Sequence, residues 1–298
     1  MLANRPPIMH PTDLACAPAE LPERQRAALI SLLADDDPAI SHSVRDQLIA
    51  CGPAAREWLR PHLLSNDPVL RRHAREITQH FSRQTADNRF VAFCLRHGED
   101  LDLEQGAWLL AQTQFPEASA DAYSALLDDY AAELRPRLAA ARGPQVMLNA
   151  VNKFLFTELG FAGNQSNYYD PDNSYLNRVL DRRIGIPISL SLVYLFLARR
   201  LQQPVTGIGL PGHFICRFQT STEEIYIDCF NRGRLMTRTD CIQYLLNGNY
   251  DLQSEYLQPL APRRILMRLC GNLHRIYYHL QRGDDITRLQ RYLVALTR

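Results

Sequence analysis

The stretch that decides the fold begins with Gly185-Ile-Pro-Ile-Ser-Leu-Ser-Leu-Val-Tyr194. Proline near its start suits the first turn of a helix, where a missing N–H costs nothing. Apolar residues continue almost all round the helix, so we expect a central, buried helix over 188–201. After Pro204 the pattern becomes β-branched or alternating, which predicts strands. These strands cover 205–209, 214–218 and 225–230.

A histidine and an aspartate lie near the ends of two predicted strands. If strands 213–218 and 225–229 pair across the polar turn 219–224, residues whose numbers add up to about 441 lie opposite. That register makes His213 and Asp228 cross-strand neighbours, with Cβ atoms roughly 5 Å apart. A carboxylate at this distance can orient an imidazole, as in a catalytic triad. The alternative is a structural histidine bonded to a turn-capping carboxylate.

A nucleophile in such a site belongs at the first turn of the buried helix, where the helix dipole lowers a thiol pKa. Ser189 is the best-placed candidate and Ser191 the next. A catalytic serine would need a strong general base and an oxyanion hole. A helix cap, the alternative that we favour, needs only the local sequence. Strand alternation turns Cys216 and Cys229 away from the His–Asp surface and predicts core positions for them.

A dense polar loop precedes the helix. Its candidate binding residues are Asn164, Asn167, Tyr168, Asp170 and Asn173. They predict a surface that lines the cleft. The alternative is a loop closed by Asx turns, with Asp170-Pro171 making the bend, which requires no ligand.

Four motifs together give the sequence a specific resemblance. They are Asn164-x-x-Asn-Tyr-Tyr-Asp-Pro-x-Asn-Ser-Tyr-Leu-Asn, Arg183-x-Gly-Ile-Pro-Ile-Ser-Leu-Ser-Leu-Val-Tyr, Gly209-Leu-Pro-Gly-His-Phe and Tyr226-Ile-Asp-Cys-Phe. Over about residues 147–245 the chain resembles the bacterial SirB family, transglutaminase-like proteins that often carry a tetratricopeptide-like tail. The resemblance implies a papain-like α+β core, with His213 and Asp228 at the superfamily's catalytic His and Asp positions. It also implies that Ser189 replaces the catalytic Cys. Related domains in eukaryotic F-box proteins favour a binding role.

The chain is predicted to have four parts. Residues 1–20 form a flexible arm, 21–142 a helical domain, 143–250 the transglutaminase-like core and 251–298 tetratricopeptide-like helices. Asp37-Pro38 recurs thirty residues later as Asp67-Pro68, each at a predicted helix start. This weak repeat favours a HEAT-like array, with a plain helical bundle as the alternative. Gly143-Pro144 is the strongest boundary signal in mid-chain.

Composition narrows the function classes. The 298 residues are 46% hydrophobic and 22% charged, with net charge +1, which gives no case for binding nucleic acid or an anionic membrane. There is no pattern typical of a signal peptide, and the longest apolar run is too short to span a bilayer. Seven scattered cysteines without a C-x-x-C pair favour reduced thiols in the cytoplasm and argue against structural zinc.

From these patterns we expect a cytoplasmic, non-catalytic transglutaminase-like protein that binds a polypeptide, with no cofactor and no metal. The alternative is an acyl transferase or an amide or peptide hydrolase that uses Ser189 as nucleophile, His213 as base and Asp228 as orienter.

Overall fold

The structure, a computed structural model, describes residues 21–298 and divides the chain into two compact units between Thr85 and Ala86. The predicted arm of residues 1–20 lies outside the described residues. The predicted boundary near Gly143 is not where the units separate. Phe90, Trp108 and Leu127 share one apolar core with residues as late as Leu296, so the helical residues between Ala86 and Gly143 are part of the second unit.

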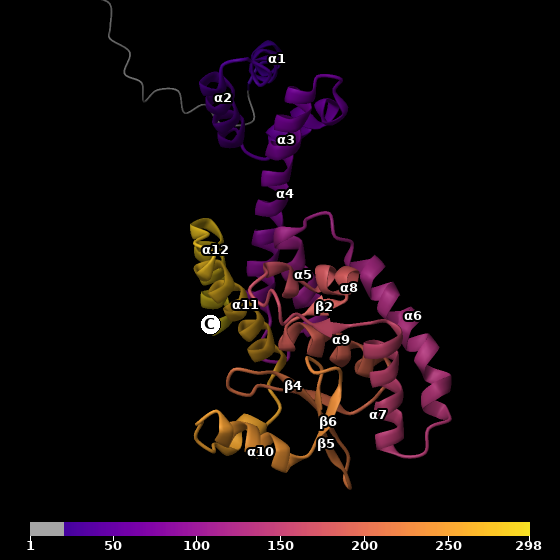
Figure 1. The fold of residues 1–298 in the computed structure, drawn as a ribbon. Coiled ribbons are helices and arrows are strands. Elements are labelled where there is room, and N and C mark those ends of the chain that lie inside the picture. Colours follow the sequence, from indigo (N-terminus) through magenta and orange to yellow (C-terminus); the bar gives the residue numbers. More distant parts are fainter. Residues whose placement is uncertain (1–20) are drawn as a thin grey trace, which may run out of the picture. The chain divides into compact units, whose positions relative to one another are not determined.

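The first unit is helical throughout its described residues (Figure 1). Its elements are α1 (Glu23–Leu32), α2 (Pro38–Ala50), α3 (Ala54–Leu59), η1 (Arg60–Leu64) and the first part of α4 (Pro68–Arg96). Asp37 accepts a hydrogen bond from the amide of Ala39, and Asp67 accepts one from Val69, each at 2.8 Å. Both Asp-Pro pairs therefore open helices, as the sequence predicts. The HEAT-like character of this unit stays a prediction.

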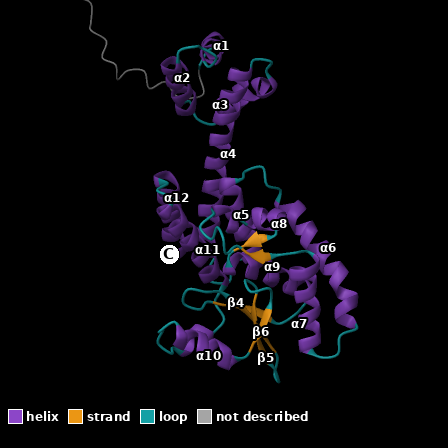
Figure 2. Cartoon of the chain, in the orientation of Figure 1, coloured by secondary structure: helices purple, strands orange, loops and turns teal. Residues whose placement is uncertain are grey.

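The second unit combines helices with two small sheets (Figure 2). After the remainder of α4, its longer helices are α5 (Leu103–Gln114), α6 (Ala120–Ala139), α7 (Pro144–Asn152), α8 (Leu176–Arg182), α9 (Pro187–Arg200), α10 (Arg238–Asn247), α11 (Pro262–His279) and α12 (Gly283–Thr297). Shorter helical segments are η2 (Lys153–Glu158), η3 (Pro171–Asn173) and η4 (Ser254–Leu257). Within residues 21–298, no helix has the length and apolarity needed to cross a membrane.

The larger sheet is antiparallel, with its strands in sequence order. They are β3 (Val205–Ile208), β4 (Ile215–Gln219), β5 (Glu224–Asp228) and β6 (Arg234–Met236). A separate pair, β1 (Ala162–Gly163) and β2 (Ile184–Gly185), is parallel. The mixed helix and sheet content agrees with the predicted α+β class.

The predicted register of the central hairpin is wrong by two residues. Cys216 lies opposite Ile227, and every β4–β5 pair has numbers that add up to 443 instead of 441. The predicted turn 219–224 is itself centred on pairs that add up to 443: Gln219 pairs with Glu224, and the amide of Thr220 donates to the carbonyl of Glu223 at 2.9 Å. Strand β4 begins at Ile215, so His213 lies in the turn before β4, not in the strand.

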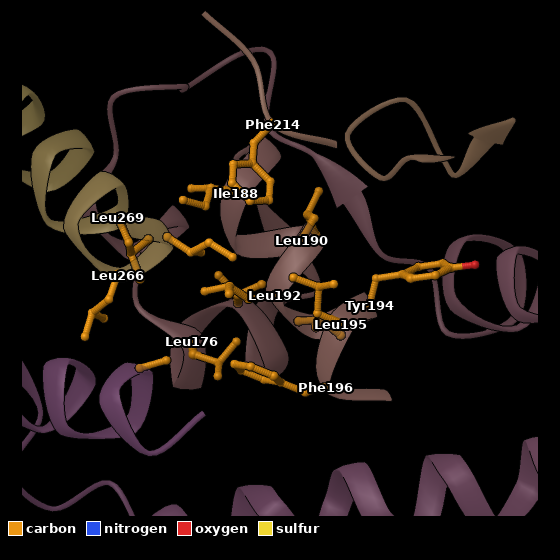
Figure 3. Packing of buried hydrophobic residues seen from close by; sticks show 14 of the residues in the cluster. Leu176, Ile188, Leu190, Leu192, Tyr194, Leu195, Phe196, Phe214, Leu266 and Leu269 are labelled. Carbon is orange, nitrogen blue, oxygen red and sulfur yellow. The ribbon is translucent and has the colours of Figure 1, made fainter. Parts of the chain in front are cut away.

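Helix α9 is the central helix that the sequence predicts. Every residue from Pro187 to Ala198 is buried. Figure 3 shows Leu192 and Leu195 of α9 among side chains that include Leu176 of α8 and Leu266 of α11. Burying apolar side chains on all sides of one helix contributes about 25 cal/mol for each Å² removed from water. The core of the second unit therefore forms around α9.

The two C-terminal helices belong to the same core instead of forming a separate unit. Leu266 and Tyr277 of α11 and Tyr292 of α12 are buried in the cluster that contains α9. The guanidinium of Arg263, at the start of α11, donates to the carbonyls of Cys94, His97, Ala295 and Leu296. The tetratricopeptide-like character of these helices stays a prediction.

A buried pair of tyrosine hydroxyl groups joins α11 to the segment before α8, and we predict that this pair stabilises the fold. Tyr175 and Tyr277 are 1% and 0% exposed, and their hydroxyl oxygens lie 2.8 Å apart. Tyr277→Phe should lower the free energy of unfolding in urea by about 1–3 kcal/mol, because the hydroxyl of Tyr175 is then buried without a partner. The double variant with Tyr175→Phe and Tyr277→Phe should lose less free energy of unfolding than the two single variants lose together. The exposed Tyr278→Phe is the control, and strictly additive effects would contradict the coupling.

Candidate functional site

His213 and Asp228 form the pair at the centre of the site. The Nε2 atom of His213 lies 3.0 Å from Oδ2 of Asp228, and the two side chains are 11% and 7% exposed. Asp228 is the last residue of β5, and His213 reaches it from the turn before β4. The structure thus brings the two expected side chains together through a register that differs from the predicted one.

Asp228 is also held by the turn that follows β5. Its Oδ1 accepts from the backbone amide of Asn231 at 3.2 Å, and its Oδ2 accepts from the side-chain amide of Asn231 at 2.8 Å. Burial alone would raise the pKa of Asp228. The hydrogen bond and charge of His213, together with the bonds from Asn231, outweigh burial and hold that pKa below its ordinary value.

The turn that carries His213 is held from two sides. Nη2 of Arg268 donates to the carbonyls of Leu210 and His213, the latter at 2.6 Å. The hydroxyl of Tyr244 donates to the carbonyl of Pro211 at 3.1 Å. Gly212 has a φ of +70°, in the left-handed region where glycine is favoured. The position of the imidazole is therefore fixed by the backbone of its own turn as well as by Asp228.

Ser189 does not complete a triad. Its hydroxyl donates to the carbonyl of Asn173 at 2.6 Å and accepts from the amide of Ile186 at 3.0 Å, and the residue is 0% exposed. No hydrogen bond joins Ser189 to His213 among residues 21–298. Because its hydroxyl binds the amide of the residue before the helix, Ser189 acts as a helix-capping residue. Ser191, the second candidate, is also 0% exposed.

A cavity of about 370 Å³ lies beside His213. Its walls are the start of α9, the turn that carries His213, one face of α11 and one residue of the polar loop. The lining residues are Pro187, Ile188, Pro211, Gly212, His213, Phe214, Arg268, Gly271, Asn272, Arg275 and Tyr168. Thus α9 presents Pro187 and Ile188 to this cavity, and neither carries a nucleophilic atom.

Most of the polar loop serves its own structure. Asn164 accepts from the amide of Asn167 at 2.9 Å and donates to the side chain of Asn173 at 3.1 Å. Asn173 in turn donates to the carbonyl of Asn167 at 2.7 Å. Asp170 caps η3 and pairs with Arg182 at 2.8 Å. Of the five candidate binding residues, only Tyr168 lines the cavity, so the loop matches the Asx-turn alternative.

Cys216 and Cys229 are core residues, as strand alternation predicts. Both are 0% exposed, with Sγ atoms 3.9 Å apart, and burial raises the pKa of Cys229. Buried thiols of this kind are unreactive.

Helix α11 contributes residues to the site that the sequence patterns above do not predict. Arg268, Gly271, Asn272 and Arg275 recur at three- and four-residue spacing, so they lie on one face of the helix. This strip is the polar face of an amphipathic helix whose other face is buried in the core. The three- and four-residue spacing of these residues is the signal that could have found it.

The comparisons with known proteins agree with this architecture. Residues 121–271 match the transglutaminase-like superfamily. This chain belongs to that superfamily. A UPF0162 protein of Xylella fastidiosa (strain 9a5c) is 36% identical over 196 residues, which is 64% of this chain and 70% of the relative. UPF0162 protein PA3419 of Pseudomonas aeruginosa is 30% identical over 203 residues, 66% of this chain and 72% of the relative.

A eukaryotic relative covers a shorter segment. F-box only protein 21 of Homo sapiens is 38% identical over 135 residues, which is 43% of this chain and 21% of that protein. No solved structure matches the chain. The superfamily therefore rests on the match over residues 121–271 and on the UPF0162 relatives.

We predict that the His213–Asp228 pair makes stability depend on acid pH. Because the pKa of Asp228 is lower in the folded chain, its carboxylate stabilises the fold above the unfolded value of 3.8, and this contribution is lost as pH falls through the folded pKa. Asp228→Asn should lower the free energy of unfolding at pH 7 by about 1.5–3 kcal/mol. On acidification, Asp228→Asn should then lose less free energy of unfolding than the unchanged protein does. Urea unfolding at several pH values measures both losses.

The exposed Asp251→Asn is the control for this experiment, and we expect its acid profile to follow that of the unchanged protein. An Asp228→Asn profile parallel to the unchanged one would show that the pair does not contribute to acid sensitivity.

Proposed function

We propose that this transglutaminase-like domain binds a polypeptide in the cavity beside His213 and does not catalyse acyl transfer. One observation carries the proposal: the start of α9 offers Pro187 and Ile188 to the cavity, while the hydroxyl of Ser189 is bonded inside the protein. Covalent catalysis needs a nucleophilic atom within reach of the imidazole. The described residues that line the cavity include no Ser, Thr or Cys.

The His213–Asp228 pair has a structural role that does not require catalysis. Asp228 fixes the imidazole, and Arg268 holds the carbonyls of the same turn, so the turn forms a rigid wall of the cavity. A rigid wall favours binding because less conformational entropy is lost when the ligand is held.

A polypeptide is the proposed ligand because the superfamily is named for enzymes that modify polypeptides, and this chain keeps the fold. The SirB-like identity, the HEAT-like and tetratricopeptide-like character of the flanking helices and a cytoplasmic location belong to the same proposal. Supporting them are the four sequence motifs, the capped Asp-Pro helix starts and the mostly buried cysteines of residues 21–298.

The alternative, a Ser189–His213–Asp228 enzyme, is less well supported. For Ser189 to attack a substrate, its hydroxyl would have to leave the carbonyl of Asn173 and the amide of Ile186. The amide of Ile186 would then be buried without its partner, at a cost of about 1–3 kcal/mol.

We predict that cysteines placed at two neighbouring positions react differently with iodoacetamide. Both positions are buried, but Pro187→Cys puts a thiol on the cavity wall, whereas Ser189→Cys puts it where the serine hydroxyl bonds groups of the interior. Alkylation of folded Pro187→Cys should be faster by at least about tenfold, since the reagent can reach residue 187 through the cavity and a thiol enclosed in the interior is inert. The rates are measured by mass spectrometry on the tryptic peptide 184–199. Equal or reversed rates would show that residue 189, not residue 187, faces the cavity.

Polypeptide binding itself is tested by selecting binders from a random peptide library on the immobilised protein. Tyr168→Ala should weaken the selected peptides by about tenfold, since truncating a buried aromatic anchor typically costs more than 1 kcal/mol. Tyr169→Ala is the matched control. The ring of Tyr169 is 44% exposed, stacks on His279 and does not line the cavity. Failure to select any peptide, or binders indifferent to Tyr168, would contradict the proposal.

A further inference from the structure

One end of the cavity is cationic. Arg268 and Arg275 of α11 both line it, and the described lining residues include no aspartate or glutamate. Asp228, the carboxylate that pairs with His213 of the lining, already accepts from His213 and Asn231. The charge of the two guanidinium groups is therefore not balanced by the cavity wall.

Of these two cations, Arg268 is the more unusual, because its charged side chain is half-buried. Only its Nη2 nitrogen has hydrogen-bond acceptors among residues 21–298, the carbonyls of Leu210 and His213. Burial lowers its pKa, as expected for a cation partly removed from water. A partly desolvated guanidinium with unused N–H groups is stabilised when an anion approaches it.

Arg275 lies two helical turns further along the same face of α11, and it is exposed. No ion pair or hydrogen bond of its side chain occurs within the described residues. Two other arginines of the C-terminal helices are satisfied: Arg263 bonds four carbonyl oxygens, and Arg288 pairs with Asp285 at 2.6 Å. Arg268 and Arg275, neither of which has a carboxylate partner within the described residues, both line the cavity.

The opposite walls add further groups that suit an anion. Burial raises the pKa of Tyr168, so its phenol stays neutral and can donate a hydrogen bond. The start of α9, which carries the positive end of that helix's dipole, forms another wall.

Building on the proposed polypeptide-binding function, we propose that the bound polypeptide presents a carboxylate to Arg268 and Arg275. A carboxylate matches guanidinium groups in charge and in planar hydrogen-bonding geometry. A single negative charge suits this end, because Arg268 already commits one nitrogen to the carbonyls of Leu210 and His213, whereas a phosphate brings nearly two charges and three acceptor oxygens. The carboxylate belongs either to an acidic side chain or to a chain terminus.

Four N-acetylated tripeptides test this assignment by isothermal titration calorimetry with the full chain. Acetyl-Ala-Glu-Ala-amide carries a side-chain carboxylate, and acetyl-Ala-Ala-Ala carries a free terminal one. Acetyl-Ala-Gln-Ala-amide is the neutral isostere, and acetyl-Ala-phosphoserine-Ala-amide carries a phosphate. At least one carboxylate peptide should bind about tenfold more tightly than the neutral one, since a hydrogen bond to a charged group contributes about 1.5–3 kcal/mol. The carboxylate peptide that binds more tightly shows whether the carboxylate belongs to a side chain or to a chain terminus.

Arg275→Ala should abolish the preference for the carboxylate peptide, whereas Arg264→Ala should keep it. Arg264 is a matched control because it is exposed on the same helix and does not line the cavity. The assignment is overturned if the neutral peptide binds as tightly as both carboxylate peptides, if no peptide binds, if phosphoserine is preferred, or if the two variants behave alike. Peptides from the library that still depend on Tyr168 would in that case uphold polypeptide binding, so the two proposals fail separately.

Discussion

The burial of α9 on every side is the constraint on which the second unit depends. A helix buried at its start must satisfy its first polar groups inside the protein, because water does not reach them. Ser189 does this by bonding the amide of Ile186 and the carbonyl of Asn173. Asn173 is bonded in turn to Asn164 and Asn167, so the polar loop and the helix start form one hydrogen-bonded network. Serine at this position is explained by structure alone.

The same constraint shapes the cavity. With Ser189 turned inward, the helix start presents Pro187 and Ile188 to the space beside His213. The pair of His213 and Asp228 fixes a turn that Arg268 holds from α11. Helix α11 therefore both closes the core and supplies the charged wall.

The sequence predicts what depends on local patterns. Apolar residues all round one helix predict the buried α9, and proline after aspartate predicts the starts of α2 and α4. The partnership of His213 and Asp228 follows from chain order, although the register does not. The turn residues are those that the polar run predicts, but strands that flank this turn pair with numbers that add up to 443, two more than the predicted sum.

What the sequence does not predict depends on contacts between distant segments. Gly143-Pro144 looks like a domain boundary, but Gly143 precedes the start of α7 with a φ of +94°, and proline takes the first helical position. The signal marks a helix start, while the division at Thr85 reflects which apolar residues share a core. The arginines of α11 were missed because they reach the cavity only after α11 packs beside α9.

The central claim is that no residue of this cavity acts as a nucleophile, and a serine-directed fluorophosphonate probe tests it most directly. The account predicts that the folded, unchanged protein is not labelled at Ser189, and that His213→Ala makes no difference. Stoichiometric labelling at Ser189 that disappears in His213→Ala would contradict it and would identify an active Ser–His pair.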